Sequence, residues 1–438
     1  MKRLQFHTDA WLDADHDDPD EARTFARLRI TVDDVNLTRN LNRKSGATSS
    51  SINVPLLPLA QYISTNWWRL LNEPFRSGAG DAFRAKHRLD VPMHGFVFPT
   101  LGLCSGGDQT ILAAWSQAYQ PYSPIDFLAQ ASVAPEILFR EEVEDALIDI
   151  VQTAIARLNG RSAASSDLAA SWDRVRRSIE DEAEYGYCRL AGKLGLDPYD
   201  PSIQDLTALT TRVSDTLLQD VSDAVFLEEL LPATTWVADN ERTWKAAPEI
   251  DVAAFGRFPK PELKSAPWEI GCRAASQFRR NTGAERIPPR KHLEQIFGEI
   301  LVAKSSTFQH APHGIGALIT RKDKTANIAT VARTAREQRF KVCTAAYIAW
   351  AGLPGEDRAA TPAFTGLQQA GRAFAAELLA PRDYLREVSP KHGLVSDDIE
   401  DIAGDLICPY ETVLWQAYHA SIPLRGIDLP APQFPSIV

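Results

Sequence analysis

The stretch from Gln338 to Pro381 constrains the fold most, because it reads as two helices that should face each other. The second helix ends at Pro381, since proline cannot continue a helix. Between the helices, residues 352–366 hold two prolines and three glycines, so neither helix can extend through them. The first helix carries one apolar stripe at helical spacing, formed by Phe340, Cys343, Tyr347 and Trp350.

The length of 438 residues allows two or three domains, each with its own core. We expect an α+β fold that is mostly helical. Residues 1–131 should form a β-rich domain, because residues 27–32 alternate polar and apolar side chains. Residues 132–245 read as a helical domain with short loops, and residues 246–266, rich in proline and lysine, as a linker. Residues 267–438, which contain the helix pair, should form a second α+β domain.

Charge and composition argue against several classes of partner. The net charge of −10 is unfavourable for a surface that follows nucleic-acid phosphates. The last helical pair, residues 397–418, carries six carboxylates and has no Lys or Arg before Arg425, which is unsuited to a DNA groove. No apolar run approaches the roughly 18 residues of a membrane span. The five scattered cysteines form no CxxC pair, and we expect reduced thiols in the cytoplasm.

The helix pair resembles the ImmA/IrrE family of metallo-endopeptidases. That family carries Arg-Phe, two residues and then Ala-His-Glu-Leu-Gly-His, followed by a helix that reads Glu-Ala-Asn-Arg-Phe-Ala-Ala-Glu-Leu-Leu-Met-Pro. Here Arg339 and Phe340 match the first word, and the run FAAELLAP from Phe374 to Pro381 matches the second. The resemblance covers a little over a third of the chain. It implies a zincin-like (metallopeptidase-like) α+β domain within residues 267–438.

The zinc chemistry of this family is missing from the matching positions. In the family, two histidines at i and i+4 hold zinc, the Glu beside the first is the general base, and a Glu on the second helix is the third ligand. None of the aligned side chains here can replace an imidazole or carboxylate ligand or act as a base. We therefore predict no catalytic residue, metal or cofactor at this site. The former zinc and base positions are Thr344, Ala345, Ile348 and Ala370.

The adjacent tryptophans Trp67 and Trp68, with Arg69, are the candidate partner-binding residues. Neighbouring side chains on a helix point about 100° apart, so both rings can be buried only at a crowded junction. Tryptophan and arginine dominate the hot spots of protein interfaces. The alternative is that one ring anchors the core and the other a domain interface. Arg69 and Glu73 are spaced for an ion pair along the helix.

The resemblance implies a catalytically silent pseudo-metallopeptidase that acts as a regulator or sensor through a protein partner. Family members are implicated in stress response and in the control of mobile elements, so a bacterial stress-response, mobile-element or phage-defence setting is expected. One alternative is a hydrolase with a site in the N-terminal region, or with an atypical metal site at His310 and His313. Another is a nucleic-acid-binding regulator with a basic surface assembled from distant residues.

Overall fold

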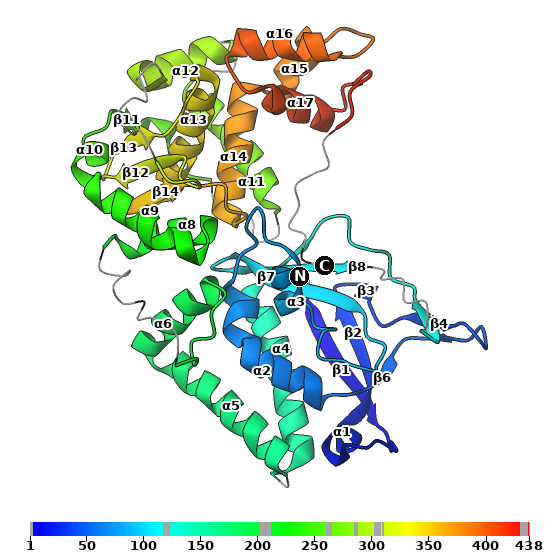
Figure 1. Cartoon of the computed structure of the whole chain (residues 1–438). Coiled ribbons are helices and arrows are strands. Elements are labelled where there is room, and N and C mark those ends of the chain that lie inside the picture. Colours follow the sequence, from blue (N-terminus) through cyan, green and yellow to red (C-terminus); the bar gives the residue numbers. More distant parts are fainter. Residues whose placement is uncertain are drawn as a thin grey trace. The chain divides into compact units, whose positions relative to one another are not determined.

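The chain is an α+β protein that divides into two compact units. The computed structural model describes residues 3–116, 123–160, 162–201, 206, 212–259, 265–283, 288–301, 308, 311–429 and 437. Unit 1 comprises Met1–Leu206 with Gln433–Val438, and unit 2 comprises Thr207–Pro432. Both units contain helices and antiparallel sheets, which can be followed in Figure 1. The predicted α+β class is therefore confirmed.

Unit 1 is built from small antiparallel sheets. The strand β2 pairs with β1, β3 and β6, and its alternate residues Ala26, Leu28 and Ile30 are completely buried, as the period of two predicts. The other two sheets have the strand orders β10-β8-β7 and β5-β4-β9. The strands are β1 (Leu4–Trp11), β2 (Phe25–Val32), β3 (Val35–Asn36), β4 (Asn40–Asn42), β5 (Thr48–Ser49), β6 (Ile52–Pro55), β7 (Thr100–Gly107), β8 (Thr110–Ser116), β9 (Ile125–Phe127) and β10 (Glu136–Phe139).

The helix α2 (Leu57–Asn72) is the centre of unit 1. It begins with a proline in its first turn and ends before Pro74, and it packs against α4, α5, α6 and β7. Because these helices and the strands share one core, they fold as one unit. The remaining helices are α1 (Pro19–Arg23), α3 (Asp81–His87), α4 (Arg140–Leu158), α5 (Ala163–Glu180) and α6 (Glu182–Lys193).

The observed division differs from the predicted domain boundaries at 131 and 245. The helices α4 to α6 belong to unit 1, whereas α8 (Asp215–Ala224), α9 (Leu227–Asp239) and α10 (Glu241–Lys245) belong to unit 2. The predicted linker, residues 246–266, is also corrected. Its strand β11 (Glu249–Asp251) pairs with β13, and the ring of Phe255 in η1 (Ala253–Phe255) is buried in the core of unit 2.

Unit 2 places a helix pair beside a four-stranded antiparallel sheet of order β11-β13-β12-β14. The helix α13 contacts three of these strands and also α14, while α11 packs on α14 (Figure 1). The strands and helices are β12 (Ala317–Arg321), β13 (Thr325–Thr330), β14 (Asp357–Ala360), α11 (Pro267–Asn281), α12 (Pro289–Phe297), η3 (Gly298–Leu301), α13 (Ala335–Ala351), α14 (Gly366–Leu379), α15 (Arg382–Val388), α16 (Ser396–Leu406) and α17 (Tyr410–His419).

The packing of α13 and α14 depends on small residues. A Cβ atom added to Gly371 of α14 would lie 3.3 Å from Cγ2 of Thr344 on α13, and one added to Gly271 of α11 would lie 2.2 Å from the carbonyl oxygen of Ala370. The predicted single apolar stripe of α13 is too narrow. Because the helix lies between the sheet and α14, nearly every side chain from Gln338 to Trp350 is buried.

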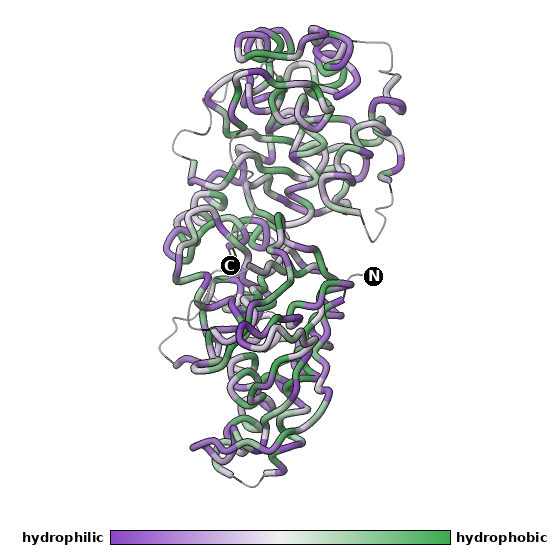
Figure 2. The backbone as a smooth tube through the Cα atoms, turned by 90° about the vertical axis from the view of Figure 1, so that its right-hand side faces the viewer, coloured by the Kyte–Doolittle hydropathy of each residue, from purple (hydrophilic) through white to green (hydrophobic). Residues whose placement is uncertain are grey.

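Hydrophobic and hydrophilic residues alternate along the chain in both units. Figure 2 shows the two colours interspersed along the tube. Within the described ranges, no helix combines the length and the apolar character that a membrane crossing requires.

Candidate functional site

The four former zinc and base positions lie in the core of unit 2. Thr344 is 5% exposed and Ala370 is 2% exposed, while Ala345 and Ile348 are completely buried. The Thr344 hydroxyl donates to the carbonyl oxygen of Phe340 at 3.0 Å, so its polar group is satisfied within the helix. These positions therefore present mainly apolar atoms to their surroundings.

The structure brings part of this predicted set together across the helix pair. Gly371 of α14 lies against Thr344, since a Cβ atom added to it would meet the Thr344 methyl group at 3.3 Å. Ala370, one residue earlier, turns its carbonyl toward Gly271 of α11 instead. The two helices thus face each other, with Thr344 against the position that follows Ala370.

An open pocket of about 280 Å³ lies beside Thr344, and we term it the Arg372 pocket. Its walls come from α13, from α14 and from the chain segments next to β12 and β14. Most of the lining is apolar, with two basic side chains among it. The lining includes Ile315, Phe340, Lys341, Thr344, Thr361 and Arg372.

The two basic side chains of this pocket are partnered differently. Lys341 forms an ion pair with Glu337 and also donates to a backbone carbonyl. Arg372 donates to the carbonyl oxygens of Thr361 at 3.0 Å and Ala363 at 2.9 Å. In the described part of the chain, no Asp or Glu forms an ion pair with Arg372, and burial lowers its pKa to about 10. Among the described residues, therefore, Arg372 has no counter-ion.

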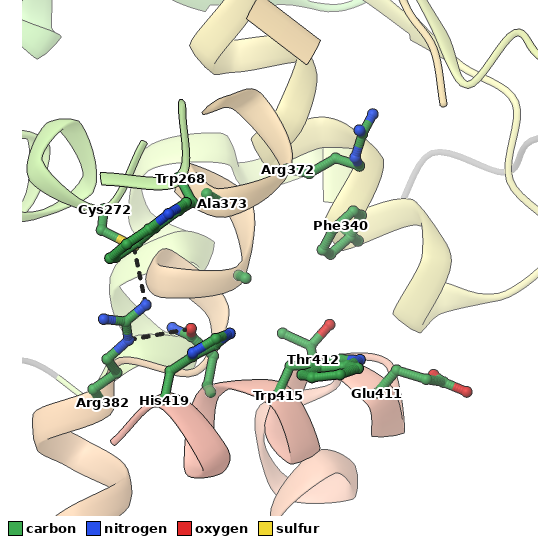
Figure 3. A pocket seen from close by; sticks show the side chains of 12 residues that line it. Trp268, Cys272, Phe340, Arg372, Ala373, Arg382, Glu411, Thr412, Trp415 and His419 are labelled. Carbon is green, nitrogen blue, oxygen red and sulfur yellow. Dashed lines mark hydrogen bonds between the residues drawn. The ribbon is translucent and has the colours of Figure 1, made fainter. Parts of the chain in front are cut away.

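A second pocket of about 290 Å³ lies between α11, α14 and α17, and we term it the aromatic pocket (Figure 3). Trp268 of α11, which lines this pocket, is 53% exposed. The His419 ring is parallel to the Trp268 ring within 6°, with their centroids 6.4 Å apart. Trp415 lies beside His419 on the wall opposite Trp268 in Figure 3. Two aromatic walls thus border one hollow.

At the polar end of the aromatic pocket, the charge of Arg382 is balanced by the Glu377 carboxylate. Arg382 lies 3.5 Å from the Glu377 carboxylate and 6.0 Å from the centre of the Trp268 ring. Glu377 also accepts a hydrogen bond from the Gln416 amide at 2.6 Å. Burial raises the pKa of Glu377, whereas burial and the Arg382 charge lower the pKa of His419. Arg382 therefore has a carboxylate partner, whereas Arg372 has only carbonyl partners among the described residues.

The predicted partner site at Trp67 and Trp68 is corrected by burial. These side chains are only 2% and 3% exposed. Trp67 packs edge-on against Trp172 at 5.1 Å, and the Trp68 indole donates to the Tyr199 hydroxyl at 2.9 Å. Both rings point into the core of unit 1 and cannot serve as exposed hot spots.

Arg69 is half-buried and held by unit 1 itself. Its guanidinium donates to the carbonyl oxygen of Gly195 and to the side chain of Asn66. The predicted ion pair with Glu73 does not form, because Glu73 instead lies 3.1 Å from the buried His87 ring. Arg69 therefore braces α2 against the end of α6.

The atypical metal site falls partly outside the described residues. His310 lies outside them, and His313 is exposed in the loop before β12. Across the ranges that the structure describes, no group of three or more His, Cys, Asp and Glu side chains is arranged to hold a metal ion.

Neither pocket could be predicted from the sequence alone. Trp268 and Trp415 are far apart in the chain and approach each other only because α11 and α17 both border α14. Arg372 had a weak signal, since it is one of two charged residues in the otherwise apolar or neutral α14. Comparisons with protein-family models, curated proteins and solved structures find no match.

Proposed function

We propose that this protein is a catalytically silent, peptidase-like regulator or sensor that acts by binding a protein partner. The proposal includes a zincin-like fold for the C-terminal region and a setting in bacterial stress response, mobile-element control or phage defence. It is supported by the resemblance of α13 and α14 to the ImmA/IrrE helices and by the lack of an imidazole or carboxylate group at Thr344, Ala345 and Ile348.

The aromatic pocket is the observation that carries the proposal. Trp268 is half-exposed next to a concave surface, and Trp415, His419 and Arg382 line the same hollow. Tryptophan and arginine around a pocket are the side chains that anchor protein partners, since they combine large apolar area with polar groups. Leaving about half of a tryptophan exposed forgoes part of the stabilisation that its burial would give unit 2.

The former metal positions support recognition over hydrolysis. Histidine and glutamate in a buried cleft would need hydrogen-bond partners or a metal to offset their desolvation. Because Thr344, Ala345 and Ile348 stand in their place, that need is absent. The two helices can then pack closely with no metal between them. The same scaffold can then present surfaces on either side of α14 for binding.

Capture of a partner from the native host tests the proposal. Wild-type protein and Trp268→Ala should be compared, with Leu353→Ala as the matched control, because Leu353 is 67% exposed and lines neither pocket. We expect one partner to be retained by the wild type and the control and to be lost by Trp268→Ala. Equal capture by Trp268→Ala, or no partner with and without stress, contradicts the proposal.

A further inference from the structure

Arg372 carries a positive charge in the lining of the Arg372 pocket. A buried cation is costly unless an anion or several hydrogen bonds compensate it. Two of its five N–H groups reach the carbonyl oxygens of Thr361 and Ala363, and no carboxylate of the described residues pairs with it. A guanidinium presents a planar fork that fits a carboxylate through two parallel hydrogen bonds. The missing component at this position is an anion of that shape.

The direction of the Arg372 guanidinium decides where a paired anion would lie. Figure 3 shows its nitrogen atoms directed away from the rings of Trp415 and His419. Its hydrogen bonds go to the segment between β14 and α14, which borders the Arg372 pocket. An anion paired with Arg372 would therefore sit in the Arg372 pocket.

The rest of the Arg372 pocket is mainly apolar. Ile315 and Phe340 supply apolar walls, and Lys341 already has the Glu337 carboxylate as its partner. The hollow is open, and its 280 Å³ is slightly below the roughly 300–1,000 Å³ of pockets that enclose whole small molecules. It suits a single carboxylate with one apolar group, attached to something that remains outside.

The edge strand β14 limits how a peptide can approach the Arg372 pocket. A peptide often binds by adding a strand to an open sheet edge, and β14 is the edge strand here. That edge is closed, because the Ala359 N–H donates to Asp220 of α8 at 2.9 Å and the Ala359 carbonyl accepts from Gln368 at 2.7 Å. Thr216 of α8 also donates to the Asp357 carbonyl. A peptide must therefore enter end-on instead of lying along β14.

We propose that the Arg372 pocket binds the C-terminal carboxylate of a polypeptide whose last residue is apolar. Arg372 pairs with the carboxylate, and Ile315 and Phe340 contact the last side chain. This inference deepens the proposed function, on which it rests, because it names the part of the protein partner that enters the peptidase-like unit.

Calorimetric titration of the full chain tests the inference with three probes. These are an acetylated tripeptide that ends in leucine with a free carboxylate, the same tripeptide as its C-terminal amide, and 4-methylpentanoate. We expect the amide to bind about 10-fold to 100-fold more weakly than the acid, as the loss of a charge-assisted pair implies. Equal binding of acid and amide, or no binding of either, overturns the inference. Binding of 4-methylpentanoate as tight as that of the tripeptide acid overturns the polypeptide source.

Variants locate the effect at Arg372. Arg372→Gln should reduce acid binding to the level of the amide. Arg290→Gln, which removes a surface cation that is paired with Glu294 and lines neither pocket, should change it by less than about twofold. If Arg372→Gln does not fold, phenylglyoxal labelling of wild-type Arg372, read by peptide mass spectrometry, replaces it. The tripeptide acid should protect Arg372 and the amide should not; equal protection overturns the inference.

Mass spectrometry of the tripeptide after titration separates this inference from the proposed function. An acid that binds and stays intact supports both. An acid that binds and is cleaved supports the carboxylate site but contradicts the silent-peptidase proposal. Failure to bind without cleavage contradicts the carboxylate site alone.

Discussion

Unit 1 and unit 2 each bring two tryptophans close to one region, with opposite results. In unit 1, Trp67 and Trp68 are neighbours on α2, and both are almost completely buried. In unit 2, Trp268 and Trp415 come from different helices and line an open pocket. The contrast is that both tryptophans of unit 1 belong to its core, whereas those of unit 2 line an open pocket.

Charged groups show the same contrast. In unit 1, the buried His87 ring has a partner at each nitrogen, the Leu103 carbonyl at 2.7 Å and the Glu73 carboxylate at 3.1 Å. In unit 2, Arg372 has two carbonyl partners and no acid within the described residues. A closed polar cluster serves the fold, while a cation that faces a pocket without its counter-ion is suited to an incoming anion.

The largest effect is expected from the tryptophans. Trp67→Ala should lower the free energy of unfolding by about 3–5 kcal/mol, because it leaves a cavity beside Trp172. Trp268→Ala should change it by less than about 0.5 kcal/mol, since that side chain is half-exposed. Urea unfolding followed by circular dichroism measures both. Similar losses for the two variants would break the contrast between the units.

The next effect sharpens the contrast between paired and unpaired arginines within unit 2. Asp220 accepts two hydrogen bonds from Arg358, at 2.8 and 2.9 Å. Asp220→Ala should destabilise unit 2 by about 3 kcal/mol, because it removes the two hydrogen bonds between Arg358 and the Asp220 carboxylate and leaves the Ala359 N–H without its acceptor. The double variant Asp220→Ala/Arg358→Met should recover part of the loss in the same denaturation experiment. No recovery would show that the ion pair is not the cause.

The third effect is a pH dependence from His292 of unit 2, for which the described residues provide no carboxylate partner of the kind that His87 has. Burial, together with Arg279, lowers its pKa from 6.5 to about 4. The unfolded state therefore binds more protons between these values, so stability is complete above pH 6.5 and falls as the pH decreases toward 4. The loss should be on the order of 2 kcal/mol.

Denaturation of wild type and His292→Gln at pH 7 and pH 4.5 isolates this contribution. The variant should lose the part of the pH slope that His292 provides, although it also changes the hydrogen bond to Thr282. An unchanged slope would mean that His292 is not the group that titrates.

Local patterns were sufficient for the helices around the candidate site. The residues that read as helices at 338–351 and 397–406 fall within α13 and α16, because helical spacing and proline or glycine stops are encoded locally. Local patterns predicted only one buried stripe on α13, whereas Thr344, Ala345 and Ile348, outside that stripe, are buried as well. The exposure of a side chain is a different matter, since it depends on which distant elements cover it.

Long-range packing explains what local patterns missed. Residues 246–266 look like a linker, but β11 within them finds a partner in β13, more than seventy residues later. The pair Trp67 and Trp68 looks like a binding site until α5 and α6 cover it. No local signal joins α11 to α17, and so the aromatic pocket emerges only from the fold.

Peptide cleavage in zinc-supplemented buffer tests most directly the central claim that unit 2 recognises a partner without cutting it. Purified wild-type protein is incubated with a mixture of unstructured peptides, with zinc or with a chelator, and the products are read by mass spectrometry. The account predicts that all peptides remain intact in both conditions. Cleavage that requires zinc and disappears with the chelator would contradict it.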